Sequence, residues 1–365
     1  MSDYRFMLSG GGTGGHIFPA LAIADKLKEM RPGSDFLFVG AKDRMEMERV
    51  PAAGYAIEGL WISGIQRSLS ARNLSFPFKL LSSLAKSNRL LRNFKPQAVI
   101  GTGGFASGPL LYMASRKGIP CLIQEQNSYP GITNKLLAQR ASKIAVAYEG
   151  MERFFPGDRI ILTGNPIREQ LKSPPENRDK NISSFNLNPS RKTLLILGGS
   201  LGARRINQLV AQHLDQLLGK DLNVLWQTGK LYYEELKSRF GEREGDQLQI
   251  TDFIKNMDQA FSSDLIISRA GAGTISELAA THRAVLLVPS PNVAEDHQTK
   301  NAMALVKEGA ALIYRENQPV EDFLPSVEKL MEQAPALAEN MKKFALPNAA
   351  DHIAQEVLKM LEINA

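Results

Sequence analysis

Cysteine, long apolar runs and, over one stretch of the chain, acidic residues are scarce in this sequence. The single cysteine, Cys121, rules out an internal disulfide and a thiolate metal cluster, and it fits a reducing compartment. No run of 18 apolar residues occurs, so we expect no membrane-spanning segment. The N-terminus leads into a strand-like run, residues 4–8, without the pattern of a signal peptide. A length of 365 residues suggests two globular domains.

Acidic residues are absent from Gly59 to Gln124, where nine Lys and Arg occur. Residues 1–160 carry 21 basic and 12 acidic side chains, whereas residues 161–365 carry 23 and 26. This uneven charge predicts an anionic partner for one face of the first half. The candidates are nucleic acid, anionic lipid and a phosphorylated substrate.

Short apolar runs bounded by glycine alternate with segments of helical spacing. Such runs are typical of parallel strands buried on both faces, so the sequence predicts an α/β fold with two doubly wound sheets and a cleft between them. The expected strands are residues 6–9, 36–39, 98–101, 121–124, 144–147, 160–162, 194–197, 224–227, 265–268, 285–288 and 311–314. The halves join near residues 164–166. Residues 173–191, rich in Pro, Asn, Ser and charge, are expected to form an exposed connection.

Four glycine-rich turns each follow an expected strand, at residues 10–16, 101–109, 198–203 and 270–274. Glycine lets backbone N–H groups approach an anion, and a following helix N-terminus favours negative charge by roughly 0.3–2 kcal/mol. A single loop of this kind is as often a packing feature as a phosphate site. Four of them, at the carboxyl ends of strands in two sheets, favour phosphate binding.

The type of phosphate ligand is narrowed by what these loops lack. None contains the Gly-Lys-Ser/Thr of a Walker loop, and the second expected strand ends in Ala41-Lys42 rather than in the acid that holds the ribose of NAD. Asp-x-Asp, a common metal–diphosphate clamp, is absent. We therefore expect backbone amides, helix termini and cations to hold a diphosphate, with no tightly bound cofactor and no fixed divalent metal.

Two charged residues leave alternatives open. Glu277 could accept both hydroxyls of a ribose or, three residues after Thr274, could complete a capping box. Arg168 could reach a diphosphate or could be a solvated charge of the linker.

Seven motifs occur together in order along the chain, and the combination is far more specific than any one of them. They are residues 10–19 (GGGTGGHIFP), 101–109 (GTGGFASGP), 124–127 with 130–135 (QEQN and PGITNK), 163–168 (TGNPIR), 197–207 (LGGSLGARRIN), 268–277 (SRAGAGTISE) and 296–302 (DHQTKNA). Over essentially its whole length the chain closely resembles the MurG family, the N-acetylglucosaminyltransferases of peptidoglycan synthesis.

The resemblance implies a GT-B glycosyltransferase of two Rossmann-like domains. It implies an acceptor- and membrane-binding domain at 1–163, a UDP-GlcNAc-binding domain at 164–345, and a C-terminal helix at 346–365 that packs back towards the first domain. The implied reaction moves GlcNAc, with inversion, from UDP-GlcNAc to the muramoyl C4 hydroxyl of undecaprenyl-diphosphate-MurNAc-pentapeptide (lipid I), giving lipid II. The implied location is the cytoplasmic face of the plasma membrane, as a peripheral protein. Cell-wall and division proteins are implied as partners by resemblance only.

The resemblance also assigns residues. The backbone of Ile254 would meet the uracil, and Gln298 would bond GlcNAc hydroxyls. The implied donor-binding residues are Thr13, Gly14, Gly15, Asn127, Arg168, Ser200, Ile254, Ala272, Gly273, Thr274, Ile275, Ser276, Glu277 and Gln298. The acceptor diphosphate would lie at Gly103, Gly104 and Phe105.

Inverting transfer needs a base for the acceptor hydroxyl. His16 is the leading candidate, because it lies in the first glycine loop at a helix start and imidazole titrates near neutral pH. Its alternative is a structural histidine that shapes the loop. Glu125 is the second candidate, with orientation of the acceptor as its alternative.

The basic stretch contains an amphipathic segment. From Phe78 onward Leu80, Leu81, Leu84 and Leu91 share one side of a helical wheel, and Lys79, Lys86 and Arg89 lie opposite. This pattern fits a core-packed helix with a solvated face. It also fits a surface that docks on anionic lipid, which the lipid-linked substrate favours. The membrane residues would be Leu74, Phe76, Phe78 and Lys79.

Rival functions remain. No nucleic-acid motif accompanies the basic charge, so we expect no nucleic-acid partner. Another GT-B enzyme, such as a UDP-GlcNAc 2-epimerase or a diacylglycerol glycosyltransferase, is the enzymatic alternative. A nonenzymatic membrane-docking protein on the same fold is the alternative from another class.

Overall fold

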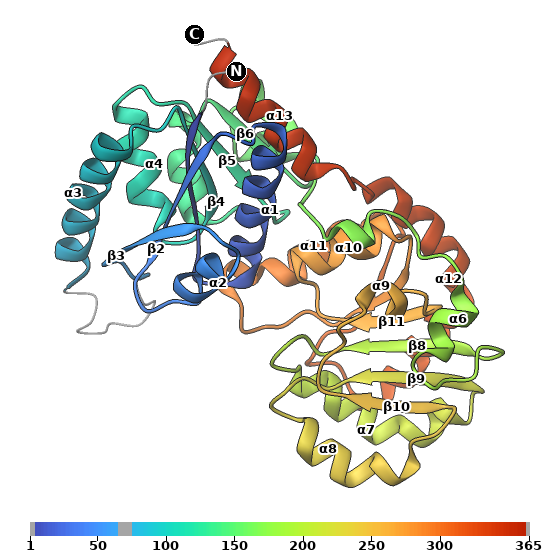
Figure 1. Cartoon of the computed structure of the whole chain (residues 1–365). Helices are drawn as coiled ribbons and strands as arrows, with labels where there is room; N and C mark the ends of the chain where they lie inside the picture. Colours follow the sequence, from blue (N-terminus) through green and yellow to red (C-terminus); the bar gives the residue numbers. More distant parts are fainter. Residues whose placement is uncertain (1–3, 65–74, 363–365) are drawn as a thin grey trace. The chain divides into compact units, whose positions relative to one another are not determined.

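The computed structural model describes residues 4–64 and 75–362 and divides the chain into two compact units. Unit 1 comprises Met1–Ile167 and Asn348–Ala365, and unit 2 comprises Arg168–Pro347. The boundaries implied at 163/164 and 345/346 lie within a few residues of these two divisions. Figure 1 shows each unit as a sheet covered by helices.

Unit 1 contains a seven-stranded sheet in which every pairing is parallel, in the order β3-β2-β1-β4-β5-β6-β7. Its strands are β1 (Arg5–Gly10), β2 (Asp35–Ala41), β3 (Ala56–Leu60), β4 (Ala98–Gly103), β5 (Cys121–Glu125), β6 (Lys143–Val146) and β7 (Ile160–Leu162). Its helices are α1 (Gly14–Met30), α2 (Glu46–Ala52), α3 (Phe76–Phe94), α4 (Ser107–Arg116), α5 (Ile132–Leu137) and α13 (Ala349–Glu362).

Unit 2 contains a six-stranded parallel sheet in the order β10-β9-β8-β11-β12-β13. Its strands are β8 (Lys192–Leu197), β9 (Leu222–Gln227), β10 (Leu248–Thr251), β11 (Leu265–Ser268), β12 (Ala284–Leu287) and β13 (Leu312–Ile313). Its helices are α6 (Arg178–Ser183), α7 (Arg204–Leu218), α8 (Tyr233–Phe240), α9 (Met257–Ala260), α10 (Ala272–Ala280), α11 (His297–Lys307) and α12 (Phe323–Met341).

The predicted α/β fold is confirmed, and the central strands lie where the apolar runs placed them. Two edge strands, β3 and β10, were missed. Their sequences, AIEGL and LQIT, include polar residues and are only partly buried, so they lack the continuous apolar signal of strands covered on both faces.

The C-terminal helix α13 belongs to unit 1 and packs along α1. Ile353, Ala354 and Val357 are fully buried in one cluster with Ile17 and residues of β1. Asp351 adds an ion pair to Lys26 on α1, with 3.2 Å between Oδ1 and Nζ. The strand β1 and the helix α13, at opposite ends of the described chain, therefore share one core.

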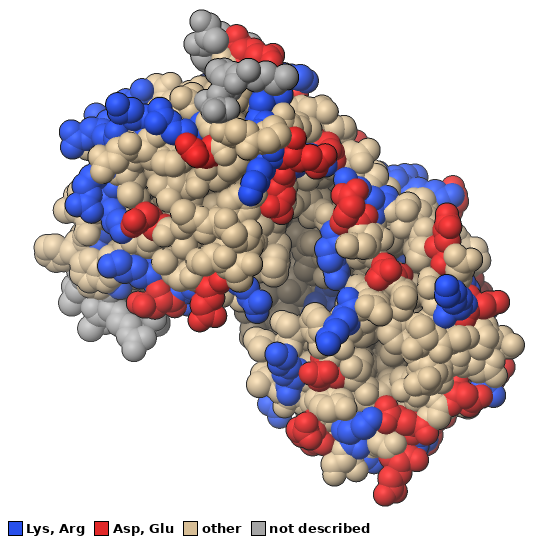
Figure 2. Space-filling view, viewed as in Figure 1, with Lys and Arg blue, Asp and Glu red and all other residues tan. Residues whose placement is uncertain are grey.

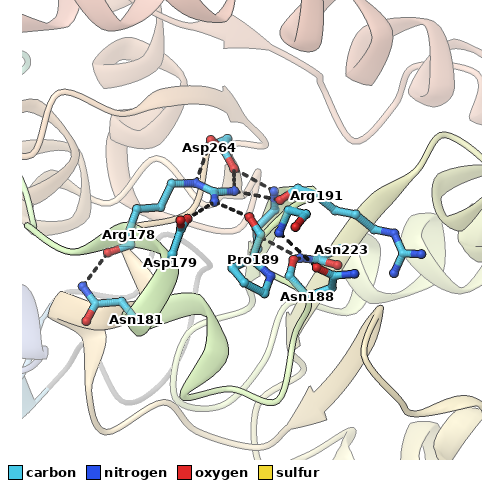
Figure 3. Close-up of polar contacts among 11 residues, drawn as sticks. Arg178, Asp179, Asn181, Asn188, Pro189, Arg191, Asn223 and Asp264 are labelled. Carbon is cyan, nitrogen blue, oxygen red and sulfur yellow. Dashed lines mark hydrogen bonds and ion pairs between the residues drawn. The ribbon is translucent and has the colours of Figure 1, made fainter.

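The predicted exposed connection at residues 173–191 is wrong in part, because this segment folds onto unit 2. The guanidinium of Arg178 donates to both carboxylate oxygens of Asp264, at 3.2 and 2.7 Å, and to the carbonyls of Pro189 and Arg191 (Figure 3). Ile182 is fully buried. The composition of the segment signalled a loop, but the buried isoleucine and the arginine fix it against the sheet.

Candidate active site

His16 lies in the first turn of α1, and the preceding loop fixes its ring. Nδ1 lies 3.0 Å from the carbonyl oxygen of Gly11 and 3.5 Å from the hydroxyl of Thr13. Because a carbonyl only accepts hydrogen bonds, Nδ1 carries the proton of the neutral ring and Nε2 keeps its lone pair. Nε2 is therefore the nitrogen available to take a proton from a substrate.

The second glycine loop packs directly against this ring. A Cβ added at Gly103 (φ +105°) would lie 3.0 Å from Nε2 of His16, and one at Gly104 (φ +89°) would lie 2.4 Å from the carbonyl oxygen of Gly11. Glycine is required at both positions by the positive φ and by the close approach. Phe105, which follows, is 46% exposed. The residues predicted to bind the acceptor diphosphate are thus adjacent to the predicted base.

Three residues of the first loop that were predicted to bind the donor surround the helix start. Thr13 is the N-cap of α1 in extended conformation, and Gly14 and Gly15 form its first turn. Thr13 and Gly15 are exposed. A ligand can therefore reach their backbone, although the predicted role remains a prediction.

Glu125, at the end of β5, is buried and its carboxylate is fully engaged. Oε1 accepts from the backbone N–H and side-chain amide of Asn127, and Oε2 accepts from the N–H of Gly131 and the amide of Asn134. Proton transfer to this group would disrupt these bonds. The geometry favours a role in holding the loop, including the predicted donor residue Asn127, and leaves His16 as the better candidate base.

In unit 2, Arg168 and Glu277 form a two-point ion pair. Nε and an Nη of Arg168 each donate at 2.7 Å, one to each oxygen of Glu277. The arginine uses one lone pair on each oxygen, so the carboxylate can still accept two hydroxyl groups. Arg168 is therefore ion-paired, while 47% of its side chain remains exposed to solvent.

Helix α10 carries six of the fourteen predicted donor residues. It begins at Ala272 with Gly271 as its N-cap, so Thr274 lies inside the helix and the capping-box alternative for Glu277 is wrong. Ala272, Gly273, Thr274 and Ser276 are at least partly exposed, whereas Ile275 is 2% exposed. The backbone N–H of Ile275 also donates to the carbonyl of Gly271 at 2.9 Å, so the predicted contact of this residue with the donor stays a prediction.

The third glycine loop and the segment predicted to meet the uracil are joined by Gln227, which the sequence reasoning missed. Its Oε1 accepts from the N–H of Gly199 at 3.0 Å, and its Nε2 donates to the carbonyls of Gly199 and Asp252 at 2.9 and 3.0 Å. The exposed Ser200 follows Gly199, and the buried Ile254 follows Asp252 by two residues. A polar residue ending the apolar strand β9 was the available signal.

Gln298, in the first turn of α11, is also anchored. Its side-chain oxygen accepts from the backbone N–H of Ser290 at 2.9 Å, which leaves its amide group to donate. This orientation is compatible with the predicted contact to sugar hydroxyls.

The predicted membrane residues on α3 differ in exposure. Phe78 is 69% exposed, whereas Phe76 packs against the core of unit 1. Lys79 donates to the hydroxyl of Ser63 at 3.0 Å. Leu81 is 65% exposed, so the helical wheel was wrong to group it with the buried Leu91. Leu74 lies outside the described residues.

Lys and Arg side chains gather around the α3 edge of unit 1 in the view of Figure 2.

In the part of the chain that the structure describes, no helix is both long and apolar enough to cross a membrane. Within the same residues, no group of three His, Cys, Asp or Glu side chains could hold a metal ion.

Two parallel-sheet, Rossmann-like units with glycine loops at their strand ends define a glycosyltransferase of the GT-B fold. The chain belongs to glycosyltransferase family 28: the N-terminal domain of that family matches residues 6–146 and its C-terminal domain matches residues 193–356.

Curated relatives cover almost the full chain. A protein of Flavobacterium psychrophilum is 53% identical over 99% of both chains, and one of Phocaeicola vulgatus is 52% identical over 99% of this chain and 97% of its own. Both are named UDP-N-acetylglucosamine–N-acetylmuramyl-(pentapeptide) pyrophosphoryl-undecaprenol N-acetylglucosamine transferase.

Solved structures agree on the fold. The crystal structure of Acinetobacter baumannii MurG is 31% identical, with a TM-score of 0.79 over 98% of this chain and 99% of its own. A UDP-N-acetylglucosamine 2-epimerase matches with a TM-score of 0.61 over 99% and 98% of the two chains, but at 13% identity it shows a shared fold alone.

Proposed function

We propose that this chain transfers N-acetylglucosamine from UDP-N-acetylglucosamine to the muramoyl C4 hydroxyl of lipid I, forming lipid II for peptidoglycan synthesis. Relatives about half identical over nearly the whole length carry this transfer in their names. The geometric observation that carries the proposal is the ring of His16, whose Nδ1 bonds the Gly11 carbonyl and whose Nε2 lies against Gly103.

In the proposed reaction His16 is the general base. Its Nε2 takes the proton of the C4 hydroxyl as the hydroxyl oxygen attacks the anomeric carbon of the donor sugar from the face opposite the UDP. The bond from that carbon to the diphosphate breaks, and the new linkage is β. The loop at Gly103–Phe105 would hold the acceptor diphosphate through backbone N–H groups.

The donor would occupy unit 2. Glu277, held by Arg168, would accept the ribose hydroxyls, and the backbone at Ile254 would meet the uracil. The amides after Gly199, the hydroxyl of Ser200 and the start of α10 would stabilise the departing diphosphate. These groups supply the charge stabilisation without a fixed metal ion, so we expect donor binding and turnover to persist in chelator.

One assay tests the activity against its rivals. Purified protein receives UDP-GlcNAc labelled in the sugar together with a lipid I analogue, and label is followed into the lipid product. Transfer to lipid I supports the proposal. UDP-N-acetylmannosamine, or free N-acetylmannosamine and UDP where water also cleaves the sugar–diphosphate bond, indicates an epimerase. Label in diacylglycerol indicates another lipid transferase. Unchanged UDP-GlcNAc from protein that nevertheless binds lipid vesicles indicates a docking protein.

His16→Ala tests the base. Loss of a general base lowers turnover by about 10²–10⁴-fold while binding persists, so we expect kcat to fall by that factor with little change in UDP affinity. His352→Ala is the matched control, because His352 is an exposed histidine on α13. Near-normal turnover of the His16 variant would contradict the assignment.

We further propose that unit 1 docks on anionic membrane through the α3 surface. The exposed Phe78 and Leu81 would enter the interface while Lys79 and Arg89 contact lipid headgroups. Vesicle sedimentation tests this: Phe78→Ser with Leu81→Ser should reduce binding to anionic vesicles, while Leu231→Ser, an equally exposed leucine of unit 2, should not. Equal binding to neutral and anionic vesicles would exclude the electrostatic contribution. Partners among cell-wall and division proteins remain a prediction from the resemblance.

A further inference from the structure

Glu46, the first residue of α2, is a fully buried acidic residue to which the proposed reaction gives no role. Its Oε2 accepts from the backbone N–H of Gly12 at 3.0 Å, and its Oε1 accepts from the N–H of Ala41 at 3.0 Å. Both oxygens act as acceptors, as in an ionised carboxylate. Among the described residues Glu46 forms no ion pair, so its stabilisation comes from these peptide groups.

The bond to Gly12 connects Glu46 to the candidate base through one peptide group. The N–H of Gly12 and the carbonyl of Gly11 belong to the same peptide plane, and that carbonyl lies 3.0 Å from Nδ1 of His16. A continuous chain of hydrogen bonds therefore runs from the Glu46 carboxylate through the Gly11–Gly12 peptide to the His16 imidazole. A negative charge at the N–H end of a peptide polarises it and makes its carbonyl oxygen a stronger acceptor.

The surrounding backbone is shaped to admit this carboxylate. A Cβ at Gly11 would lie 2.2 Å from Oε1 of Glu46, and a Cβ at Gly40 would lie 2.5 Å from its Cγ. Glycine at these two positions therefore leaves room for the Glu46 side chain beneath the first loop. Any larger residue at Gly11 or Gly40 would collide with the Glu46 side chain, so the backbone of the first loop and of β2 is fitted to this carboxylate.

We propose that Glu46 is a positioning residue for the transfer, acting on His16 through the Gly11–Gly12 peptide. It holds that peptide so that its carbonyl faces Nδ1, fixes the tautomer with the lone pair on Nε2, and strengthens the Nδ1 hydrogen bond as the ring gains a proton in the transition state. This inference rests on the proposed function, in which His16 is the base.

A double-mutant cycle tests the link. Glu46→Gln keeps the shape and removes the charge and one acceptor. We expect it to lower kcat by about 10–100-fold, the rate equivalent of one charge-assisted hydrogen bond, with the donor KM nearly unchanged. In a His16→Ala background the same substitution should cause almost no further loss. Glu244→Gln is the matched control, because Glu244 also accepts from a backbone N–H, that of Ile250, but lies in unit 2.

The outcomes separate the two proposals. If Glu46→Gln lowers kcat equally with and without His16, its role is merely structural and the positioning role is overturned, while transfer by the wild type leaves the proposed function intact. If wild-type protein transfers no GlcNAc, the proposed function itself fails. If His16→Ala keeps full activity, the base assignment fails, and the role of Glu46 fails with it.

A measurement on the wild type covers the case in which the variant does not fold. Nitrogen-15 NMR of the imidazole at about pH 8.5, where a histidine is neutral, distinguishes the two tautomers. The His16 signals are assigned by their loss in His16→Ala. A proton on Nδ1 supports the proposed hydrogen-bond chain, and a proton on Nε2 overturns it.

Discussion

Gln227 offers a sharp test of how unit 2 is organised for a donor. Replacing it with methionine keeps the length and volume of the side chain but removes three hydrogen bonds, two to Gly199 and one to the carbonyl of Asp252. The glycine loop that precedes Ser200 and the segment that leads to Ile254 would then lose the side chain that ties them together.

The size of the effect follows from these bonds. Each neutral hydrogen bond contributes about 1 kcal/mol net, and a buried N–H left without an acceptor costs about 1–3 kcal/mol. The three bonds together contribute about 3 kcal/mol to holding the two loops in place. If about half of this free energy has to come from donor binding in the variant, the binding free energy weakens by about 1.5 kcal/mol. That corresponds to roughly a tenfold rise in the dissociation constant of UDP-GlcNAc.

Isothermal titration with UDP and with UDP-GlcNAc measures this change, and transfer kinetics show whether KM for the donor rises while KM for the acceptor stays constant. Gln247→Met is the matched control, since Gln247 also donates to two backbone carbonyls, those of Leu218 and Leu222, at 2.8 and 3.1 Å. Equal effects of the two variants on donor binding would refute the reasoning, because general destabilisation of unit 2 would then explain both.

Three further predictions concern other parts of the molecule. Asp264→Ala should lower the free energy of unfolding by about 1–3 kcal/mol in denaturant titration, because it removes the carboxylate partner of the half-buried Arg178. A change under 0.5 kcal/mol would mean that this ion pair does not help to hold the segment. Burial raises the pKa of the Cys121 thiol to about 12, so in a thiol-reagent assay at pH 8 this cysteine should react only when the protein unfolds; rapid reaction of the native protein would contradict its burial. Glu277→Gln should weaken UDP-GlcNAc binding about tenfold in titration, since an amide offers one acceptor where the carboxylate offers two, and unaltered affinity would exclude the ribose contact.

Much of the fold could be predicted because the signals are local. The strands β1 and β8 contain the buried apolar runs Phe6–Leu8 and Leu194–Leu197, and glycine follows each run within two residues. Burial on both faces of the sheet requires such a composition. The edge strand β3 could not be found in this way, because Glu58 and its half-exposed neighbours are typical of a loop as much as of a sheet edge. The anchoring of residues 173–191 by Arg178 could not be predicted either, because its partner Asp264 lies 86 positions further along the chain.

For the candidate site, the sequence identified the loops but not the residues beneath them. His16 is part of a recognisable motif, whereas Glu46 and Gln227 lie on other elements and reach the loops only after the sheets form. Their roles depend on which backbone N–H each side chain meets, and no spacing in the sequence encodes that distance.

Glu46 and Gln227 also explain why two similar glycine loops can differ in how they interact with an anion. Beneath the first loop the N–H of Gly12 is taken by the carboxylate of Glu46, so a negative charge already sits where an anion would bind. Beneath the third loop the N–H of Gly199 is taken by the neutral amide of Gln227, which adds no charge. The N–H of Gly12 is therefore not available to a phosphate, and the acceptor diphosphate proposed to lie at Gly103–Phe105 would have to use the N–H groups of that second loop. In the third loop Gln227 adds no charge that would oppose an anion, so the dipoles of the loop and of the following helix can act on the departing diphosphate of the donor.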